Sequence, residues 1–392
     1  MTVRTEKNGN RAIAYPEGKI DASNAADVQK ELEAVRAENP DCELEVDAGG
    51  LAYISSAGLR ALLQLTRSQD KPLAVVNVTP AVYEIFEVTG FTEILRVKKA
   101  YRRLSVDGCE VIGRGYYGTI YRIDDETIVK VYRGKDSIPM IENEISMAKT
   151  AFLGGIPTAI AYDIVQVGED YGAVFEMLHA TTYMEWIRNS PEDRERIVDS
   201  YARFLRQVND TVLDGGTLPS VKRRFQDCLS AVNGVLPAEE YERLKQLIGA
   251  VPESMNAVHG DCHLKNIMRV DGEPMLIDMD TLSVGNAVFE LACIFFGMIP
   301  FEEDEPGNTM AFYGISHETA EYIWNRSTRV YFGNPDEDTL HDMRDRAMLL
   351  GWLYFLYRMQ TDLQGEPLSD IRTVHACEHI RELLGRVREL AV

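Results

Sequence analysis

The residues best suited to carry chemistry lie in two neighbouring segments, His259-Gly-Asp-Cys-His-Leu-Lys-Asn266 and Leu276-Ile-Asp278-Met-Asp280. Asp261 supplies a carboxylate for an attacking hydroxyl group, and Asn266 and Asp278 supply oxygen ligands of the kind that hold Mg²⁺ on phosphates. One loop carries both Asp261 and Asn266, and a strand that ends at Asp278 presents the third group from an adjoining hairpin. The pattern indicates phosphoryl transfer.

The other side chains of this loop are expected to be structural. His259 is predicted to orient the loop through hydrogen bonds. Cys262 and His263 have no further Cys or His at the spacing of a metal site, so they are predicted to be packing residues.

A glycine-rich segment lies upstream, where Gly113, Gly115 and Gly118 follow the spacing G-x-G-x-x-G. This spacing fits a dinucleotide-binding turn, a tight hairpin or a loop that covers phosphates. No helical pattern follows Gly118, as the dinucleotide fold requires. Residues 119–123 alternate instead like the second arm of a hairpin.

Lys130 lies twelve residues after Gly118, inside an apolar strand. After a glycine-rich hairpin, such a lysine is typical of one that binds the α- and β-phosphates of ATP. Glu144, in the helical segment 142–149, is placed to fix it by an ion pair. Glu142 remains a rival for this role.

The first hundred residues alternate strands and helices, which predicts an α/β domain with a mixed sheet covered by helices. The strands are expected at 11–15, 43–47 and 73–78, and helices are expected to begin at an Asn24–Asp27 capping box, at Ser55-Ser56 and at Thr79-Pro80. We assign residues 1–100 to this domain and 101–108 to a linker. Strand-like segments then predict a smaller lobe over 109–178. Residues 179–392 are predicted to be mostly helical, with helices near 189–210, 219–232, 237–249, 317–332 and 338–361.

Residues 109–392 resemble the aminoglycoside phosphotransferase and choline kinase-like family. The glycine loop, Lys130, Glu144 and the two segments named first carry the resemblance. It implies the bilobal, protein-kinase-like α+β fold, with ATP and Mg²⁺ as cofactors. It also implies that Glu176 and Leu178 form the hinge that binds adenine. Gly113, Gly115, Gly118, Lys130 and Glu144 would then contact the nucleotide, Asn266 and Asp278 the metal, and Asp261 the acceptor.

Two departures separate this chain from protein kinases. Gly260 replaces the arginine of the H-R-D loop, and only twelve residues lead from Asp278 to Glu290-Leu-Ala. This leaves little chain for a peptide-binding platform, so a small-molecule acceptor is favoured. Relatives often have an aspartate where this chain has Glu290.

Residues 1–100 resemble STAS domains, the fold of anti-sigma factor antagonists. The resemblance is carried by four segments in order: 18–24, 51–60, 77–80 and 89–91. It implies an anti-sigma factor or switch-kinase partner that phosphorylates a serine at a helix start, here Ser56. The family usually has an acid just before that serine, and this chain has Ser55.

The chain has 392 residues and a formal net charge of −21, of which −18 falls in residues 101–392. A nucleic-acid partner needs clustered Lys and Arg, so none is expected. The acidic balance favours a cationic acceptor, with Phe301–Glu305 as a candidate lining, although a solvated surface loop also explains this stretch. No run of about 20 apolar residues is present, so no membrane partner is expected. The six scattered cysteines indicate a reduced, cytoplasmic protein.

The leading hypothesis is an ATP-dependent phosphotransferase that acts on a small hydroxylated molecule and carries a regulatory or docking STAS domain. One alternative is a signalling protein whose STAS domain binds a switch partner while the kinase-like half senses nucleotide. In a third hypothesis the kinase-like half phosphorylates Ser56.

Overall fold

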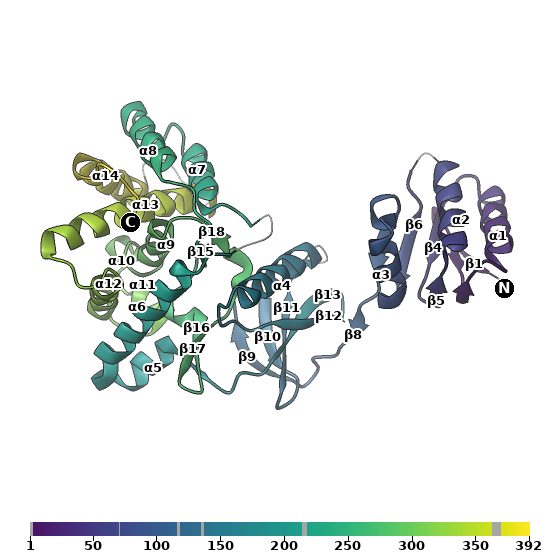
Figure 1. Ribbon diagram of the computed structural model, residues 1–392, viewed down its shortest axis with the longest axis horizontal. Helices are drawn as coiled ribbons and strands as arrows, with labels where there is room; N and C mark the ends of the chain where they lie inside the picture. The colour runs from purple at the N-terminus through teal and green to yellow at the C-terminus, as the bar shows by residue number, and fades with distance from the viewer. Residues whose placement is uncertain (1–2, 70, 116–117, 135–136, 214–217, 363–369) are drawn as a thin grey trace. The chain divides into compact units, whose positions relative to one another are not determined.

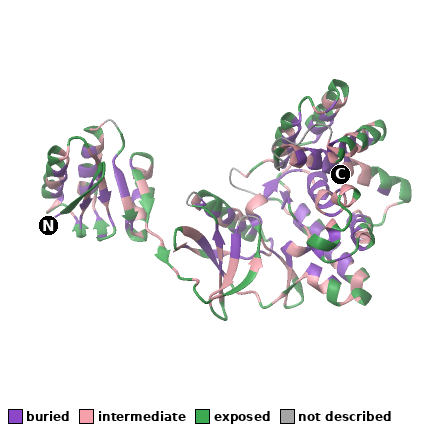
Figure 2. Ribbon diagram, turned by 180° about the vertical axis from the view of Figure 1, so that it is seen from behind, coloured by how far each residue is buried: buried purple, intermediate pink, exposed green. Residues whose placement is uncertain are grey.

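The computed structural model describes residues 3–69, 71–115, 118–134, 137–213, 218–362 and 370–392. The chain divides into two compact units, Met1–Ser105 and Val106–Val392, each of which has its own hydrophobic core (Figures 1 and 2). No helix in the described part of the chain is long and apolar enough to cross a membrane.

The N-terminal unit is built on a five-stranded sheet with the strand order β1-β2-β4-β6-β7. β1 is antiparallel to β2, and the other neighbours are parallel, which confirms the predicted mixed sheet. The sheet strands are β1 (Arg4–Asn8), β2 (Arg11–Tyr15), β4 (Glu43–Asp47), β6 (Ala74–Val78) and β7 (Arg96–Lys99). A separate parallel pair consists of β3 (Gly18–Ile20) and β5 (Leu51–Ile54), and β8 spans Arg102–Arg103.

The α-helices in the described part of this unit are α1 (Ala25–Glu38), α2 (Ser56–Arg67) and α3 (Pro80–Val88). α1 buries Val28, Leu32 and Val35, which recur at helical spacing on one face. The predicted capping box at its start is wrong. Asn24 stands at the N-cap, but its amide oxygen accepts from the Asp21 N–H at 2.9 Å and its amide nitrogen donates to the Lys19 carbonyl at 2.8 Å. The side chain therefore closes the preceding loop instead of capping the helix.

The C-terminal unit begins with an antiparallel sheet in which the strands lie in the order β12-β13-β11-β10-β9. We call this sheet and α4 the N-lobe. β9 and β10 pair as the predicted hairpin, and β10 continues into β11. The N-lobe elements are β9 (Glu110–Arg114), β10 (Gly118–Arg122), β11 (Thr127–Tyr132), α4 (Ile138–Leu153), β12 (Ala161–Val167) and β13 (Asp170–Glu176).

The remaining elements are mostly helical and form the C-lobe (Figure 1). α9 is buried along most of its length because it packs against α13, which also contacts α7 and α14. The C-lobe helices are α5 (Tyr183–Asn189), α6 (Arg194–Asp210), α7 (Val221–Ala231), α8 (Ala238–Ala250), α9 (Val288–Met298), α10 (Phe301–Asp304), α11 (Asn308–Tyr313), α12 (His317–Tyr331), α13 (Glu337–Asp362) and α14 (Ile371–Arg386). Its short strands are β14 (Thr181–Thr182), β15 (Ala257–Val258), β16 (Ile267–Val270), β17 (Glu273–Leu276) and β18 (Ser283–Val284).

Candidate active site

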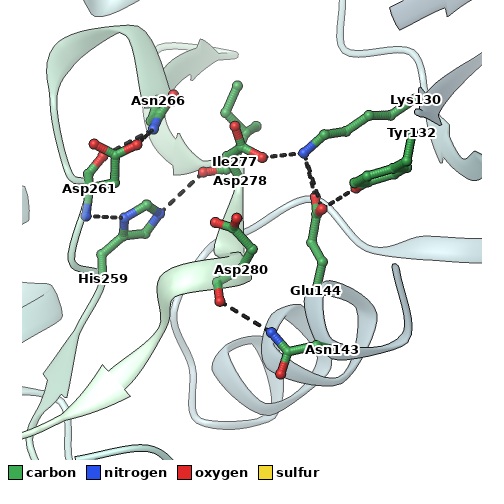
Figure 3. Close-up of polar contacts among 10 residues, drawn as sticks. All are labelled: Lys130, Tyr132, Asn143, Glu144, His259, Asp261, Asn266, Ile277, Asp278 and Asp280. Carbon is green, nitrogen blue, oxygen red and sulfur yellow. Dashed lines mark hydrogen bonds and ion pairs between the residues drawn. The ribbon is translucent and has the colours of Figure 1, made fainter. Parts of the chain in front are cut away.

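Lys130 lies at the centre of a charged cluster that joins the two lobes (Figure 3). Its ammonium nitrogen is 3.1 Å from both carboxylate oxygens of Glu144 on α4, and it also contacts the carboxylate of Asp278 in the C-lobe. Glu144 is 4% exposed, whereas its rival Glu142 is exposed on the same helix. The structure therefore pairs Lys130 with Glu144.

Tyr132 is a member of this cluster that the sequence analysis missed. Its hydroxyl group donates to Glu144, and its ring lies 5.1 Å from the Lys130 nitrogen. The signal was present, because residues two apart on a strand point to the same face. Burial raises the pKa of Tyr132 well above its usual range, so the hydroxyl keeps its proton and acts as a donor.

The charges of the cluster act on one another. Burial alone would lower the pKa of Lys130, but Asp278 and Glu144 together raise it, so the ammonium form is maintained. Burial raises the pKa of Asp280 to about 6, with further contributions from the negative charges of Asp278 and Glu144. Two carboxylates, those of Glu144 and Asp278, therefore contact Lys130, and the nearby Asp280 adds negative charge to the cluster.

Asp261 and Asn266 are paired within the loop that connects β15 to β16. The Asn266 amide nitrogen lies 3.0 Å from the carbonyl oxygen of Asp261 and 3.0 Å from its Oδ2 atom. Because both contacts use the nitrogen, the amide oxygen of Asn266 remains available to a ligand. The Asp261 side chain is 53% exposed, so its carboxylate is accessible to solvent.

His259 connects this loop to the residue before Asp278. Its Nδ1 atom accepts from the Asp261 N–H at 3.2 Å, so the hydrogen lies on Nε2, which donates to the Ile277 carbonyl at 3.2 Å. The Ile277 N–H in turn donates to the Asn266 carbonyl at 3.0 Å. These contacts give His259 the orienting position predicted for it, and they place Asp261, Asn266 and Asp278 on two loops that are bonded together (Figure 3).

Glu290 anchors the same loop from α9. It is fully buried, and its carboxylate accepts from the backbone N–H of His259 at 2.5 Å and from that of Gly260 at 3.0 Å. Gly260 has a φ of +82°, a conformation that favours glycine. Glu290, at a position where relatives often have an aspartate, therefore still provides a carboxylate in contact with the loop backbone.

Asp278 and Asp280 follow the end of the strand β17, which forms a hairpin with β16. Asp278 has a left-handed backbone, with φ +64°, and its side chain is 42% exposed. The Asp280 carbonyl accepts from the Asn143 side chain on α4 at 3.2 Å, which adds a second bond between the lobes. Among the described residues, no group of three or more His, Cys, Asp or Glu could hold a metal ion. Asn266 and Asp278 fit the alternative way of binding Mg²⁺, in which a few protein oxygens act together with substrate phosphates.

The glycine positions and the predicted hinge positions lie in or beside the N-lobe sheet. At Gly118 a β-carbon would collide with the carbonyl oxygen of Val131, so glycine is required there by close strand packing. Gly113 and Gly115 lie on either side of Arg114, and residues 116–117 of the loop lie outside the described part. Glu176 ends β13 and is exposed. Leu178 packs with Ile277 against the N-lobe core.

The acidic stretch 301–305 is bonded to other parts of the C-lobe. Glu303 lies 2.8 Å from His379, and Asp304 lies 2.8 Å from His375, both on α14. The other two acids are also engaged: Glu302 accepts from the backbone of Gly307 and Thr309, and Glu305 pairs with Arg372. These contacts remove the stretch as support for a cationic acceptor.

In the N-terminal unit, Ser55 and Ser56 have different positions at the start of α2. Ser55 is the N-cap, and its hydroxyl oxygen accepts from the Gly58 N–H at 3.4 Å. Ser56 is the first helical residue and is exposed. Gly58 is needed beneath them, because a β-carbon there would lie 2.7 Å from the side chains of Ile20 and Ile54.

Comparisons with known proteins match each unit of the chain to a family. Residues 108–323, more than half of the chain, match the model of the phosphotransferase enzyme family, APH, and residues 7–97 match the model described as "Mlab, STAS domain". A protein named as an anti-sigma factor antagonist, BtrV of Bordetella bronchiseptica, is 35% identical over 101 residues, which are 25% of this chain and 85% of that protein.

Many solved structures are similar at low identity, and they include an aminoglycoside phosphotransferase and a choline/ethanolamine kinase family protein. Aminoglycoside phosphotransferase APH(2'')-Ib in its ADP-bound form is 13% identical, covers 77% of this chain and 96% of its own, and has a TM-score of 0.44. A choline/ethanolamine kinase family protein from Mesorhizobium loti is 15% identical, covers 71% of this chain and 91% of its own, and has a TM-score of 0.45. The family models and the kinase-like lobes together lead to one assignment: the chain belongs to the phosphotransferase enzyme family and carries a STAS domain ahead of its phosphotransferase domain.

Proposed function

We propose that this protein transfers the γ-phosphoryl group of ATP, with Mg²⁺, to a hydroxyl group of a small molecule. The observation that carries the proposal is the hydrogen-bonded pair of loops that brings Asp261, Asn266 and Asp278 together, with Asp278 in contact with Lys130. Phosphoryl transfer depends mainly on positioning and on the neutralisation of charge, and these four groups can supply both.

Each residue has a part in this mechanism. Lys130, held by Glu144, would bind the α- and β-phosphates, and the backbone of Glu176 and Leu178 would bind adenine. Asn266 and Asp278 would hold Mg²⁺, which neutralises phosphate charge when bound. Asp261 would orient the acceptor hydroxyl group and accept its proton. Glycines 113, 115 and 118 let the hairpin backbone approach the phosphates closely.

The test replaces Asp261 with Asn and measures phosphoryl transfer to a panel of hydroxylated metabolites. We expect Asp261→Asn to lower the transfer rate by roughly 10²- to 10⁴-fold, the usual contribution of a positioned acid or base. The affinity for ATP should stay nearly unchanged, because Asp261 does not contact the nucleotide in this mechanism. Asp271→Asn, in the turn between β16 and β17, is the matched control. Normal turnover by Asp261→Asn would refute the assigned role.

We further propose that the STAS domain docks a switch-type partner and that Ser56 can be phosphorylated there. Exposed Ser56 at the first position of α2 supports this proposal, since a helix N-terminus tolerates phosphate. The test incubates three proteins with labelled ATP and Mg²⁺: the wild type, Asp261→Asn and Ser56→Ala. Mass spectrometry then maps the position of any labelled phosphate. Label at Ser56 that is lost in both variants would indicate self-phosphorylation. Unlabelled protein that still phosphorylates a small acceptor would exclude self-phosphorylation and leave Ser56 to a partner that docks on the STAS domain, which is the result we expect.

A further inference from the structure

Arg224 is a partly buried cation beside Gly260, the residue that precedes Asp261. It lies on the inner face of α7, between the buried residues Val221 and Cys228. A β-carbon at Gly260 would be 3.1 Å from its Nη1 atom and 3.2 Å from its Nη2 atom, so the guanidinium borders the residue next to Asp261.

The contacts of Arg224 do not neutralise its charge. Nη2 donates to the Cys293 sulfur at 3.2 Å, the guanidinium lies 5.6 Å from the centre of the Tyr354 ring, and Nε is buried without a hydrogen-bond partner. In the described part of the chain, no carboxylate forms an ion pair with it within 4.0 Å. An unpaired guanidinium is costly to bury, because it gives up hydration without gaining an anion.

The groups that face Arg224 are neutral at pH 7. Burial raises the pKa of Cys293 to about 12 and that of Cys228 to about 11, in both cases despite the nearby arginine. Burial also raises the pKa of Tyr354. None of these three groups therefore balances the positive charge of Arg224.

A second cation lies on the other side of Asp261 along the loop. Lys265 donates to the Phe312 carbonyl at 3.4 Å and lies 4.1 Å from the centre of the Phe312 ring. Burial lowers the pKa of Lys265, the charge of Arg188 lowers it further, and Asp261 partly offsets this. Arg224 therefore borders the residue before Asp261, and Lys265 follows Asp261 in the same loop, in a domain whose overall charge is strongly negative.

We propose that the acceptor carries an anionic oxygen group, a carboxylate or a phosphate, that Arg224 binds while Asp261 receives the acceptor hydroxyl. This inference rests on the proposed function and names the class of its substrate. The planar guanidinium can donate two parallel hydrogen bonds to either group, which fixes the orientation of the acceptor as well as its charge. It replaces the expectation of a cationic acceptor.

The test compares four six-carbon polyols that differ in charge: gluconate, sorbitol 6-phosphate, sorbitol and 1-amino-1-deoxysorbitol. Binding to the full chain and transfer from ATP are measured at constant ionic strength for the wild type, Arg224→Gln and Arg224→Lys. Arg223→Gln is the matched control, because Arg223 lies on the same helix with a side chain that is 76% exposed and paired with Asp227.

We expect the wild type and Arg223→Gln to bind an anionic polyol about 10- to 100-fold more tightly than sorbitol. Arg224→Gln should lose this preference, and Arg224→Lys should keep part of it. Preference for gluconate would identify a carboxylate, and preference for sorbitol 6-phosphate a phosphate. A structural residue would weaken binding of all four polyols equally, and an unchanged ratio in Arg224→Gln would overturn the inference.

Sulfate provides a test that needs no matching polyol. At constant ionic strength it should raise the Tm of the wild type and Arg223→Gln more than that of Arg224→Gln, and equal shifts would overturn the inference. Transfer to sorbitol or the amine in preference to the anions would also overturn it while the proposed function stands. Absence of Asp261-dependent transfer to any alcohol would overturn the proposed function. The sulfate comparison would still test whether Arg224 binds an anion.

Discussion

The ammonium group of Lys130 lies 3.1 Å from both carboxylate oxygens of Glu144, whose side chain also accepts from Tyr132. Glu144→Gln would weaken the ion pair and disturb the buried bond from Tyr132. We expect a loss of about 1–3 kcal/mol in the free energy of unfolding and a higher KM for ATP. Urea titration and steady-state kinetics measure the two effects. Glu142→Gln, an exposed change on the same helix, should alter neither, and equal effects of the two variants would contradict the pairing.

Asp278 is the second carboxylate on Lys130 and the proposed ligand of the cation. Asp278→Ala should weaken binding of an Mg²⁺–nucleotide complex by about tenfold or more, since a charged oxygen ligand is lost. Isothermal titration with a non-hydrolysable ATP analogue measures this, with and without EDTA. Removal of Mg²⁺ should weaken binding in the wild type and have little further effect in Asp278→Ala. If EDTA affects both proteins equally, Asp278 is not the ligand.

Gly260 combines a left-handed backbone with a crowded position. Gly260→Ala should cost about 1–2 kcal/mol for the backbone alone, and more because the new methyl group meets Arg224 and the Thr281 carbonyl oxygen. Gly272→Ala is a matched control, because φ is +92° there and no atom lies within 4 Å of the new carbon. Denaturant unfolding should show the larger loss at Gly260. Equal losses would mean that Arg224 moves aside freely.

Glu290 satisfies two backbone N–H groups inside the C-lobe. Glu290→Ala leaves these donors without an acceptor, and each buried donor left unpaired costs about 1–3 kcal/mol. We expect lower stability by urea unfolding and a lower kcat with a smaller change in KM for ATP, because the Asp261 loop loses its anchor. Glu273→Ala, on an exposed position of β17, is the control. Unchanged kcat in a folded Glu290→Ala protein would show that the loop holds its shape without this contact.

Sequence spacing predicted the parts of the site that lie close together in the chain. Asp261 and Asn266 share one loop, so the short stretch of sequence between them already limits the distance between their side chains in space. The choice between Glu142 and Glu144 depended on which face of α4 packs against the sheet. The positions of the two residues in the sequence do not determine that face. Tertiary packing decided it by burying Glu144.

Arg224 was missed because α7 carries no recognisable motif. An arginine between Val221, Phe225 and Cys228 on an otherwise apolar helix face was nevertheless a readable signal. Its proximity to Gly260 depends on how α7 packs against the loop before β16, and no local pattern encodes that packing. The mixed sheet of the N-terminal unit was predictable because alternating strands and helices leave few other arrangements.

In the proposed mechanism, the contact between Lys130 and Asp278 makes nucleotide binding and cation binding interdependent. Each side chain neutralises the other, so a nucleotide that takes Lys130 leaves the Asp278 carboxylate exposed to phosphate charge. A cation that takes Asp278 frees Lys130 for phosphates. Each ligand thus removes an obstacle to the other, and by thermodynamic linkage the two affinities must rise by the same factor. An affinity for ATP measured on this protein therefore has meaning only at a stated concentration of free Mg²⁺.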